Sequence, residues 1–167
     1  MISERLFSEL NKQINYELYS SHFYLAMAAY AASEDLPGFE NFFKVQAEEE
    51  NFHAMKIFNY INEMGGRVKL ESLHTPENDF ESLIDVFSKG LEHEKFVTSR
   101  IYLLTDIATE EREHATISFL KWFIDEQVEE ESNFSTILSK LKRVGEDNNG
   151  IYMIDSDLAQ RVFTPPV

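Results

Sequence analysis

The segment from Pro37 to Met64 constrains the fold most, because apolar residues recur in it at helical spacing until Gly65-Gly66. Side chains three or four residues apart lie on one face of a helix, so the segment predicts one long amphipathic helix. Glu50 and His53 interrupt its apolar face near the middle, about one turn apart. A carboxylate and an imidazole in this arrangement can bind one metal ion, as in helical bundles that bind two irons. The other residues of that face carry no charge: Phe39, Phe42, Gln46, Ile57, Tyr60 and Met64.

The spacing of Glu50 and His53 is not specific by itself. Glu71 precedes His74, and Glu111 precedes His114, at the same distance. We expect Glu71 and His74 to be exposed in a connection, and Glu111 and His114 to belong to a charged rim. The two other histidines flank the helical faces and are expected to be surface or interface residues: His22 and His93.

Three more segments predict long helices with a polar residue near the middle of an apolar face. They run from about 3 to 33, from 81 to 109 and from 111 to 144, and Ser3 suits the first N-cap. Helix midpoints stay level in an up-and-down bundle, so the polar residues should converge on Glu50 and His53. These residues are Glu17 in the first helix, Glu94 in the third, and Gln127 and Glu130 in the fourth.

The connection from Gly65 to about Phe80 interrupts the helical pattern with Gly65-Gly66 and His74-Thr75-Pro76. When extended, such a segment covers about 50 Å, and a helix of about 28 residues is about 42 Å long. The connection can therefore run the whole length of the bundle and make the second and third helices parallel. The sequence predicts an all-α four-helix bundle with one long crossover between helices two and three.

Four carboxylates at the centre of such a bundle would repel one another. Each close pair costs about 4 kcal/mol at an effective dielectric of about 20, and desolvation adds several kcal/mol per ion. No basic residue occupies any of the four apolar faces, so multivalent cations are the better explanation. Oxygen ligands with one nitrogen suit iron, manganese or, less selectively, zinc. The alternative is a hydrogen-bonded polar layer without metal.

Length and composition limit the other possibilities. The 167 residues fit one domain, divided into the bundle at 1–145 and a linker, short helix and tail at 146–167. A net charge of −15 opposes nucleic-acid binding, and the absence of cysteine excludes disulfides, thiolate zinc sites and iron–sulfur clusters. The sequence has no apolar run as long as a membrane span and no signal peptide pattern, so we expect a cytoplasmic protein.

Several motifs occur in order along the chain: Asn15-Tyr16-Glu17-Leu18-Tyr19-Ser20-Ser21 with Tyr24, Ala47-Glu48-Glu49-Glu50 with His53, His93-Glu94, Phe119-Leu120-Lys121-Trp122, Glu126-Gln127 with Glu129-Glu130, and Gly150-Ile151-Tyr152 with Ile154-Asp155. With these motifs the chain resembles the bacterial non-haem ferritins from end to end. The resemblance implies a ferritin-like bundle whose copies form a hollow twenty-four-subunit cage. It also implies ferroxidase activity, in which Fe(II) is oxidised by O2 and Fe(III) is stored as hydrated oxide.

The resemblance also implies three iron sites. Two of them form the di-iron centre: the first iron is held by Glu17, Glu50 and His53, and the second by Glu50 as a bridge, Glu94 and Glu130, with Gln127 beside it. The third lies toward the cavity of the cage, near Glu49, Glu126 and Glu129.

Tyr24 and Trp122 lie beside the centre in this family and are implied to supply or relay electrons. Core packing is the other interpretation of both aromatic residues. Bacterioferritins have a haem-ligating Met near the second-helix motif and a His at the position of Glu130. Asn51-Phe52 follows the motif here, so we expect iron and no haem.

Three other functions share features with the iron-storing ferroxidase that the resemblance implies. A rubrerythrin-like di-iron oxidase or peroxidase uses the same bundle without storing a mineral, but its usual electron-transfer domain needs cysteines. A DNA-protecting miniferritin has its iron sites between subunits, whereas ligands on all four helices of one chain indicate a site within the bundle. A helical interaction module would bind no metal.

The C-terminal segment adds a short helix that the four-helix core does not need. We expect a break from Gly145 to Gly150 and a helix from about Ser156 to Phe163, with Leu158 and Val162 as an i, i+4 pair. A helix this short must be held by packing. The resemblance implies that four of these helices meet at each four-fold axis of the cage. Docking onto the bundle of the same chain is the alternative.

Overall fold

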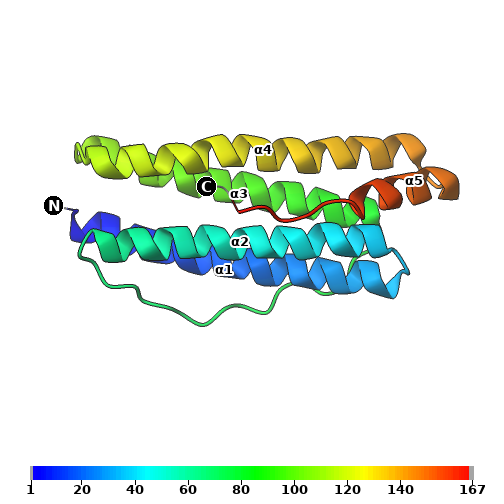
Figure 1. The fold of residues 1–167 in the computed structure, drawn as a ribbon, viewed down its shortest axis with the longest axis horizontal. Helices are drawn as coiled ribbons and strands as arrows, with labels where there is room; N and C mark the ends of the chain where they lie inside the picture. The colour runs from blue at the N-terminus through cyan, green and yellow to red at the C-terminus, as the bar shows by residue number, and fades with distance from the viewer. Residues whose placement is uncertain (1, 166–167) are drawn as a thin grey trace.

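A computed structural model describes residues 2–165 and contains five helices and no strand in that range. Figure 1 shows four long helices side by side and a short fifth helix at one end of the bundle. The predicted all-α fold is therefore confirmed. Residue 1, the start of the predicted bundle segment, and residues 166 and 167, the end of the predicted tail, lie outside the described residues. The helices are α1 (Glu4–Ser33), α2 (Pro37–Glu63), α3 (Leu83–Glu110), α4 (His114–Val144) and α5 (Asn148–Leu158).

The crossover between α2 and α3 runs the length of the bundle and makes these two helices parallel, as predicted (Figure 1). Two asparagines of α1 hold it. Asn15 Nδ2 donates to the carbonyl of Lys69 at 3.1 Å, and its Oδ1 accepts from the Glu71 N–H at 2.8 Å. Asn11 binds the carbonyl of Arg67 and the N–H of Lys69 in the same way. The side chains thus provide hydrogen bonds that an irregular segment cannot make within itself.

The helix ends are set by local capping. Ser3 caps α1, as predicted, by accepting a hydrogen bond from a backbone N–H three residues along the chain. Ser82 caps α3 in the same way, so α3 begins slightly later than predicted. α4 begins at His114 and not at Glu111, because Arg112 has a φ of 56°. This left-handed conformation cannot continue a helix.

Two apolar clusters fill the bundle, and the predicted polar residues lie between them along each helix. On α3, for example, Glu94 stands between Phe87 of one cluster and Val97 of the other. The clusters therefore bound the polar layer along the bundle axis. The first cluster includes Tyr24, Phe43, Phe87 and Phe134, and the second includes Leu10, Ile57, Ile101 and Phe123.

None of the helices within residues 2–165 has a stretch long and apolar enough to cross a bilayer.

The C-terminal helix lies earlier in the chain than predicted. α5 spans Asn148–Leu158, whereas the sequence pattern predicted a helix from Ser156 to Phe163. Asp147 caps α5 by accepting a hydrogen bond from the Asn149 N–H at 3.1 Å. The residues that were interpreted as a break, Asn148-Asn149-Gly150, therefore form the first turn of the helix.

The predicted i, i+4 pair of Leu158 and Val162 is also wrong, because Val162 lies beyond the helix and is 74 % exposed. α5 packs against its own chain through Ile154 and Asp155, which are both buried. Docking onto the bundle, the alternative in the sequence analysis, is therefore what the single chain shows. Two apolar residues of α5 remain exposed: Tyr152 and Met153.

Asp155 connects α5 to the first turn of α2. Its Oδ1 accepts hydrogen bonds from the Gly38 N–H at 2.8 Å and the Phe39 N–H at 3.0 Å. Leu36, the N-cap residue of α2, provides no side-chain hydrogen bond, so Asp155 supplies the missing cap. Gly38 permits this contact, because a Cβ at that position would lie 1.7 Å from the carbonyl oxygen of Asp155.

Candidate metal centre

Polar side chains from all four long helices meet between the two apolar clusters. Their ion pairs within the described chain involve His53 and no lysine or arginine. Buried carboxylates in such a setting must be neutralised by protons or by a bound cation. All six side chains stand at the predicted positions and are at most 3 % exposed: Glu17, Glu50, His53, Glu94, Gln127 and Glu130.

Glu17, Glu50 and His53 form a compact group whose ligand atoms all lie within 4.8 Å of one another. His53 Nδ1 is 3.4 Å from Glu50 Oε2. Glu17 Oε1 accepts a hydrogen bond from Gln13 at 2.9 Å, but Glu17 Oε2 is buried and has no hydrogen-bond partner. A buried polar atom without a partner costs about 1–3 kcal/mol. Two carboxylates and an imidazole at this distance fit a divalent ion such as iron, manganese or zinc.

Glu94 is engaged differently from the other carboxylates. The Tyr24 hydroxyl donates to Glu94 Oε1, and Gln127 Nε2 donates to Glu94 Oε2 at 3.1 Å. Both carboxylate oxygens therefore have partners. Glu94 belongs to neither of the two three-residue groups whose ligand atoms lie within 4.8 Å. The structure thus brings Glu94 and Gln127 together in the polar layer, outside the compact group of Glu17, Glu50 and His53.

Two buried glutamines that the sequence analysis did not select orient the carboxylates. Gln46 Nε2 donates to Glu130 Oε2 at 2.8 Å and to Glu50 Oε1 at 3.3 Å, and so connects two helices. Gln13 holds Glu17. Each glutamine precedes a site carboxylate on its own helix by four residues, about one turn. That spacing is the signal by which the sequence could have identified them.

A second group of carboxylates extends from His53 toward the surface. His53 Nε2 is 3.8 Å from Glu126 Oε1, and His53, Glu126 and Glu130 have ligand atoms within 4.8 Å of one another. Glu126 and Glu129 line a cavity of about 220 Å³ together with Glu49. These three residues, called the outer carboxylates below, are those that the sequence resemblance assigned to a third iron.

Tyr24 and Trp122 each contact a residue of the polar layer. Tyr24 is fully buried, and its hydroxyl donates to Glu94. The Trp122 ring lies edge-to-face against His53, with the ring centroids 5.4 Å apart, and Lys56 Nζ lies 4.7 Å from the centroid of the Trp122 ring. Both aromatic side chains are therefore in direct contact with groups that could bind metal.

Burial shifts the pKa values of the central groups. It raises the pKa of Glu130 to about 8, with the charge of Glu94 adding to the shift, and the pKa of Glu94 to about 7. Burial also raises the pKa of Glu50 well above its usual value. For His53, burial by itself lowers the pKa, but hydrogen bonds with Glu126 and Glu50 raise it well above the usual range. The metal-free centre therefore holds protons at neutral pH, and a cation would displace them.

The metal-free protein is expected to lose stability as the pH rises from about 5 to about 8. Glu94 and Glu130 have an ordinary pKa of 4.5 and folded-state values of about 7 and about 8, so the folded state binds more protons in this interval. A higher pH then favours the unfolded state. The raised pKa of His53 acts in the same direction. Thermal unfolding in a chelator at pH 5.5 and pH 8 measures the effect.

Zn²⁺ should reverse this dependence, because metal ligands must lose their protons. The stabilisation by Zn²⁺ should therefore grow with pH. Glu130→Gln removes one of the titrating carboxyls and should flatten the slope of the metal-free protein. If wild type and Glu130→Gln lose the same stability between the two pH values, the central carboxyls do not cause the loss.

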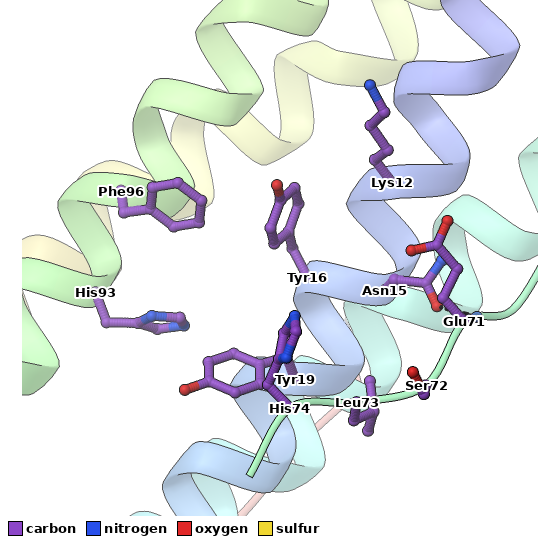
Figure 2. A pocket seen from close by; sticks show the side chains of 10 residues that line it. All are labelled: Lys12, Asn15, Tyr16, Tyr19, Glu71, Ser72, Leu73, His74, His93 and Phe96. Carbon is purple, nitrogen blue, oxygen red and sulfur yellow. Dashed lines mark hydrogen bonds between the residues drawn. The ribbon is translucent and has the colours of Figure 1, made fainter. Parts of the chain in front are cut away.

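A larger cavity, of about 550 Å³, lies under the crossover, away from the carboxylates. His93 Nε2 is 2.7 Å from Ser20 Oγ, and burial lowers the pKa of His93 to about 4. His93 is thus a half-buried neutral side chain, so the expectation of a surface or interface position holds only in part. His22, His74 and His114 are exposed, as predicted. Figure 2 shows side chains pointing into this cavity: Tyr16 and Tyr19 from α1, His74 from the crossover, and His93 and Phe96 from α3.

Known proteins resemble this chain over nearly its whole length. Residues 7–144 match the ferritin model, which describes a ferritin-like domain. The bacterial non-haem ferritin of Staphylococcus aureus (strain USA300) is 46 % identical over 163 residues, and that of Staphylococcus haemolyticus (strain JCSC1435) is 45 % identical, each match covering 98 % of both chains.

Two solved structures of Archaeoglobus fulgidus ferritin have a similar fold. A form engineered to be closed has a TM-score of 0.96 at 44 % identity and covers 98 % of this chain and 100 % of that chain. The open-pore form has a TM-score of 0.96 at 43 % identity and covers 97 % of this chain and 100 % of that chain. Together with the helical bundle and its buried carboxylates, these similarities show that the chain belongs to the ferritin family.

Proposed function

We propose that this chain is an iron-storage subunit that oxidises Fe(II) with O2 inside its bundle. The Fe(III) product would be stored as hydrated oxide within a hollow assembly of many copies. One observation carries the proposal: the ligand atoms of Glu17, Glu50 and His53 lie buried within 4.8 Å of one another, and Glu17 Oε2 has no partner. Membership of the ferritin family supports iron as the ion.

The proposed ligands follow the assignment made from the sequence. Glu94 must exchange part of its hydrogen bonding with Tyr24 and Gln127 for a bond to iron, because both of its oxygens accept hydrogen bonds from these residues. In the proposal, Glu17, Glu50 and His53 hold the first iron, Glu50, Glu94 and Glu130 hold the second with Gln127 beside it, and Glu49, Glu126 and Glu129 hold the third.

The protein provides charge, geometry and exclusion of water, while iron provides the redox chemistry. Two Fe(II) ions would give up one electron each, and O2 would accept both together with two protons to form hydrogen peroxide. The bound iron replaces the protons that Glu50 and Glu130 carry in the metal-free protein. Tyr24 and Trp122 contact Glu94 and His53, positions from which they could supply or relay further electrons.

The second iron position is expected to bind more weakly than the first. Gln127 and Glu130 stand where a symmetric centre would have Glu and His, so this position has no imidazole, and Gln127 is neutral and donates to Glu94. A weakly held ion suits a centre that must release its product.

Assembly into a cage, in the cytoplasm, is part of the proposal. The Archaeoglobus fulgidus relatives are described as open-pore and closed forms, and a pore implies a shell. In the single chain, Tyr152 and Met153 are 72 % and 69 % exposed, and a neighbouring subunit could cover them. The proposed number of twenty-four subunits rests on the family resemblance. The strongly acidic chain gives no reason to expect a nucleic acid or a membrane as partner.

Aerobic addition of Fe(II) to the purified protein tests the proposal. We expect O2 to be consumed, Fe(III) absorbance to develop, and the iron to elute with a large particle on a sizing column. A rubrerythrin-like oxidase would oxidise Fe(II) without retaining a mineral, and a helical interaction module would do neither. Elution of the iron apart from the protein, after rapid oxidation, would therefore contradict the storage function.

A further inference from the structure

The C-terminal tail returns along the bundle and closes one side of the cavity that contains the outer carboxylates. Figure 1 shows the tail running from α5 back toward the middle of the bundle. Phe163 and Thr164 line this cavity of about 220 Å³ together with Glu49, Glu126 and Glu129. The Phe163 ring packs edge-to-face on Phe52 of α2, with the ring centroids 6.0 Å apart.

Arg161 holds this tail in place through an ion pair with Glu49. Arg161 Nη2 lies 2.5 Å from Glu49 Oε2, and the two side chains are only 19 % and 20 % exposed. The guanidinium carbon lies 4.4 Å from the ring centroid of Phe42, and Nη1 donates to the Phe42 carbonyl at 3.4 Å. Asn41 Nδ2 donates to the carbonyl of Arg161 at 2.9 Å and to that of Leu158 at 3.0 Å. Packing and backbone contacts thus fix the position of the arginine.

The same carboxylate oxygen cannot serve the arginine and a metal ion equally well. Arg161 Nη2 already contacts Glu49 Oε2, and both side chains are largely shielded from solvent. Arg161 therefore supplies the positive charge that a cation would otherwise bring to this oxygen. The ligand atoms of Glu17, Glu50 and His53 have no lysine or arginine among their ion-pair partners in the described chain. Competition by a basic side chain is thus a property of the outer carboxylates and not of the central group.

We propose that Arg161 is a displaceable internal counter-ion of Glu49, so that a divalent cation binds the outer carboxylates only as the guanidinium leaves and the tail segment 161–164 lifts from the cavity. This inference rests on the proposed function, because it takes the outer carboxylates to be an iron site.

Two consequences follow from an exchange of one cation for another. The central sites fill before the outer site, since the outer site must first break the ion pair between Arg161 and Glu49. Binding at the outer site also opens the cavity, because Phe163 and Thr164 follow Arg161 along the same short segment. Arg161 would thereby delay iron at the surface of the bundle until the centre is loaded.

Calorimetric titration of the metal-free, fully assembled protein with Zn²⁺ measures this competition without redox chemistry. The sites that disappear in a Glu129→Gln variant identify the outer site. Arg161→Gln should tighten Zn²⁺ binding there at least about 10-fold, because a competing charge is removed from a partly buried carboxylate. The central sites should be unaffected. Arg161→Lys keeps the charge and should resemble wild type, as should Arg143→Gln, which removes the same charge from an exposed position of α4.

Hydrogen exchange detected by mass spectrometry follows the tail itself, where the Arg161 N–H donates to the Leu158 carbonyl at 3.2 Å. Filling the outer site with Zn²⁺ should speed exchange in the C-terminal peptide of wild type. An unchanged outer-site affinity in Arg161→Gln, or a tail whose exchange does not respond to Zn²⁺, overturns the inference. Those outcomes leave Fe(II) oxidation and mineral retention intact, whereas failure of the proposed function would remove both.

Discussion

Replacing Glu50 by alanine is expected to slow the oxidation of Fe(II) by O2 at least about 100-fold. Loss of a residue that merely orients a metal ligand typically costs about 10- to 100-fold, and loss of a bridging ligand should cost more. Glu50 is the one carboxylate proposed to contact both irons. It is 2 % exposed, lies within 4.8 Å of ligand atoms of Glu17 and His53, and accepts a hydrogen bond from Gln46. Stopped-flow absorbance after mixing with substoichiometric Fe(II) measures the rate.

His53→Ala should have a similar effect, since it removes the one imidazole of the centre. Glu48→Ala is the matched control, because Glu48 is an exposed carboxylate on the same helix. The metal-free stability of Glu50→Ala should equal or exceed that of wild type, because a buried carboxyl is removed. Wild-type oxidation rates in both Glu50→Ala and His53→Ala would show that iron is oxidised elsewhere.

The positions of the central residues were predictable because helical periodicity is a local property. Once four long apolar faces are recognised, Glu17, Glu50, Glu94 and Glu130 must point inward at similar heights, whichever way each helix runs. The hydrogen bonding of each carboxylate was not predictable in the same way. The contact of Tyr24 with Glu94 depends on the relative rotation of two helices, which the sequence pattern does not determine.

The C-terminal segment shows where a local pattern is insufficient. Asn148-Asn149-Gly150 has the composition of a turn, but Asp147 caps a helix there. The helix is then fixed by Asp155, whose partners Gly38 and Phe39 are more than a hundred residues earlier in the chain. The tail beyond α5 has no periodicity at all, and its position depends on Arg161 and Asn41. These contacts between distant residues leave no periodic pattern in the sequence from which they could be predicted.

Deleting residues 148–167 should abolish mineral retention while sparing the first oxidation of Fe(II). Every residue proposed for the three iron sites precedes this segment, so the central group should form as before. The deletion removes the Asp155 cap of α2 and the exposed apolar residues Tyr152 and Met153. We therefore expect a helical protein that oxidises Fe(II) but forms smaller or leaky particles and precipitates ferric oxide. Light scattering and iron retention on a sizing column measure this outcome.

Two substitutions keep α5 in the chain but weaken its contact with α2, and so test whether α5 must be docked there. Asp155→Ala removes the cap of α2 and should lower the free energy of unfolding by about 1–2 kcal/mol, whereas Asp157→Ala, at an exposed position of α5, should change it by less than about 0.5 kcal/mol. Gly38→Ala places a Cβ where 1.7 Å separates it from the Asp155 carbonyl oxygen, so α5 must move away from α2. If docking positions α5 for contact with neighbouring subunits, Asp155→Ala and Gly38→Ala should both leak iron, and Asp157→Ala should retain it.

A variant without residues 148–167 that elutes as an intact particle with its mineral in solution would contradict the role of α5, because the cage would then close without this helix.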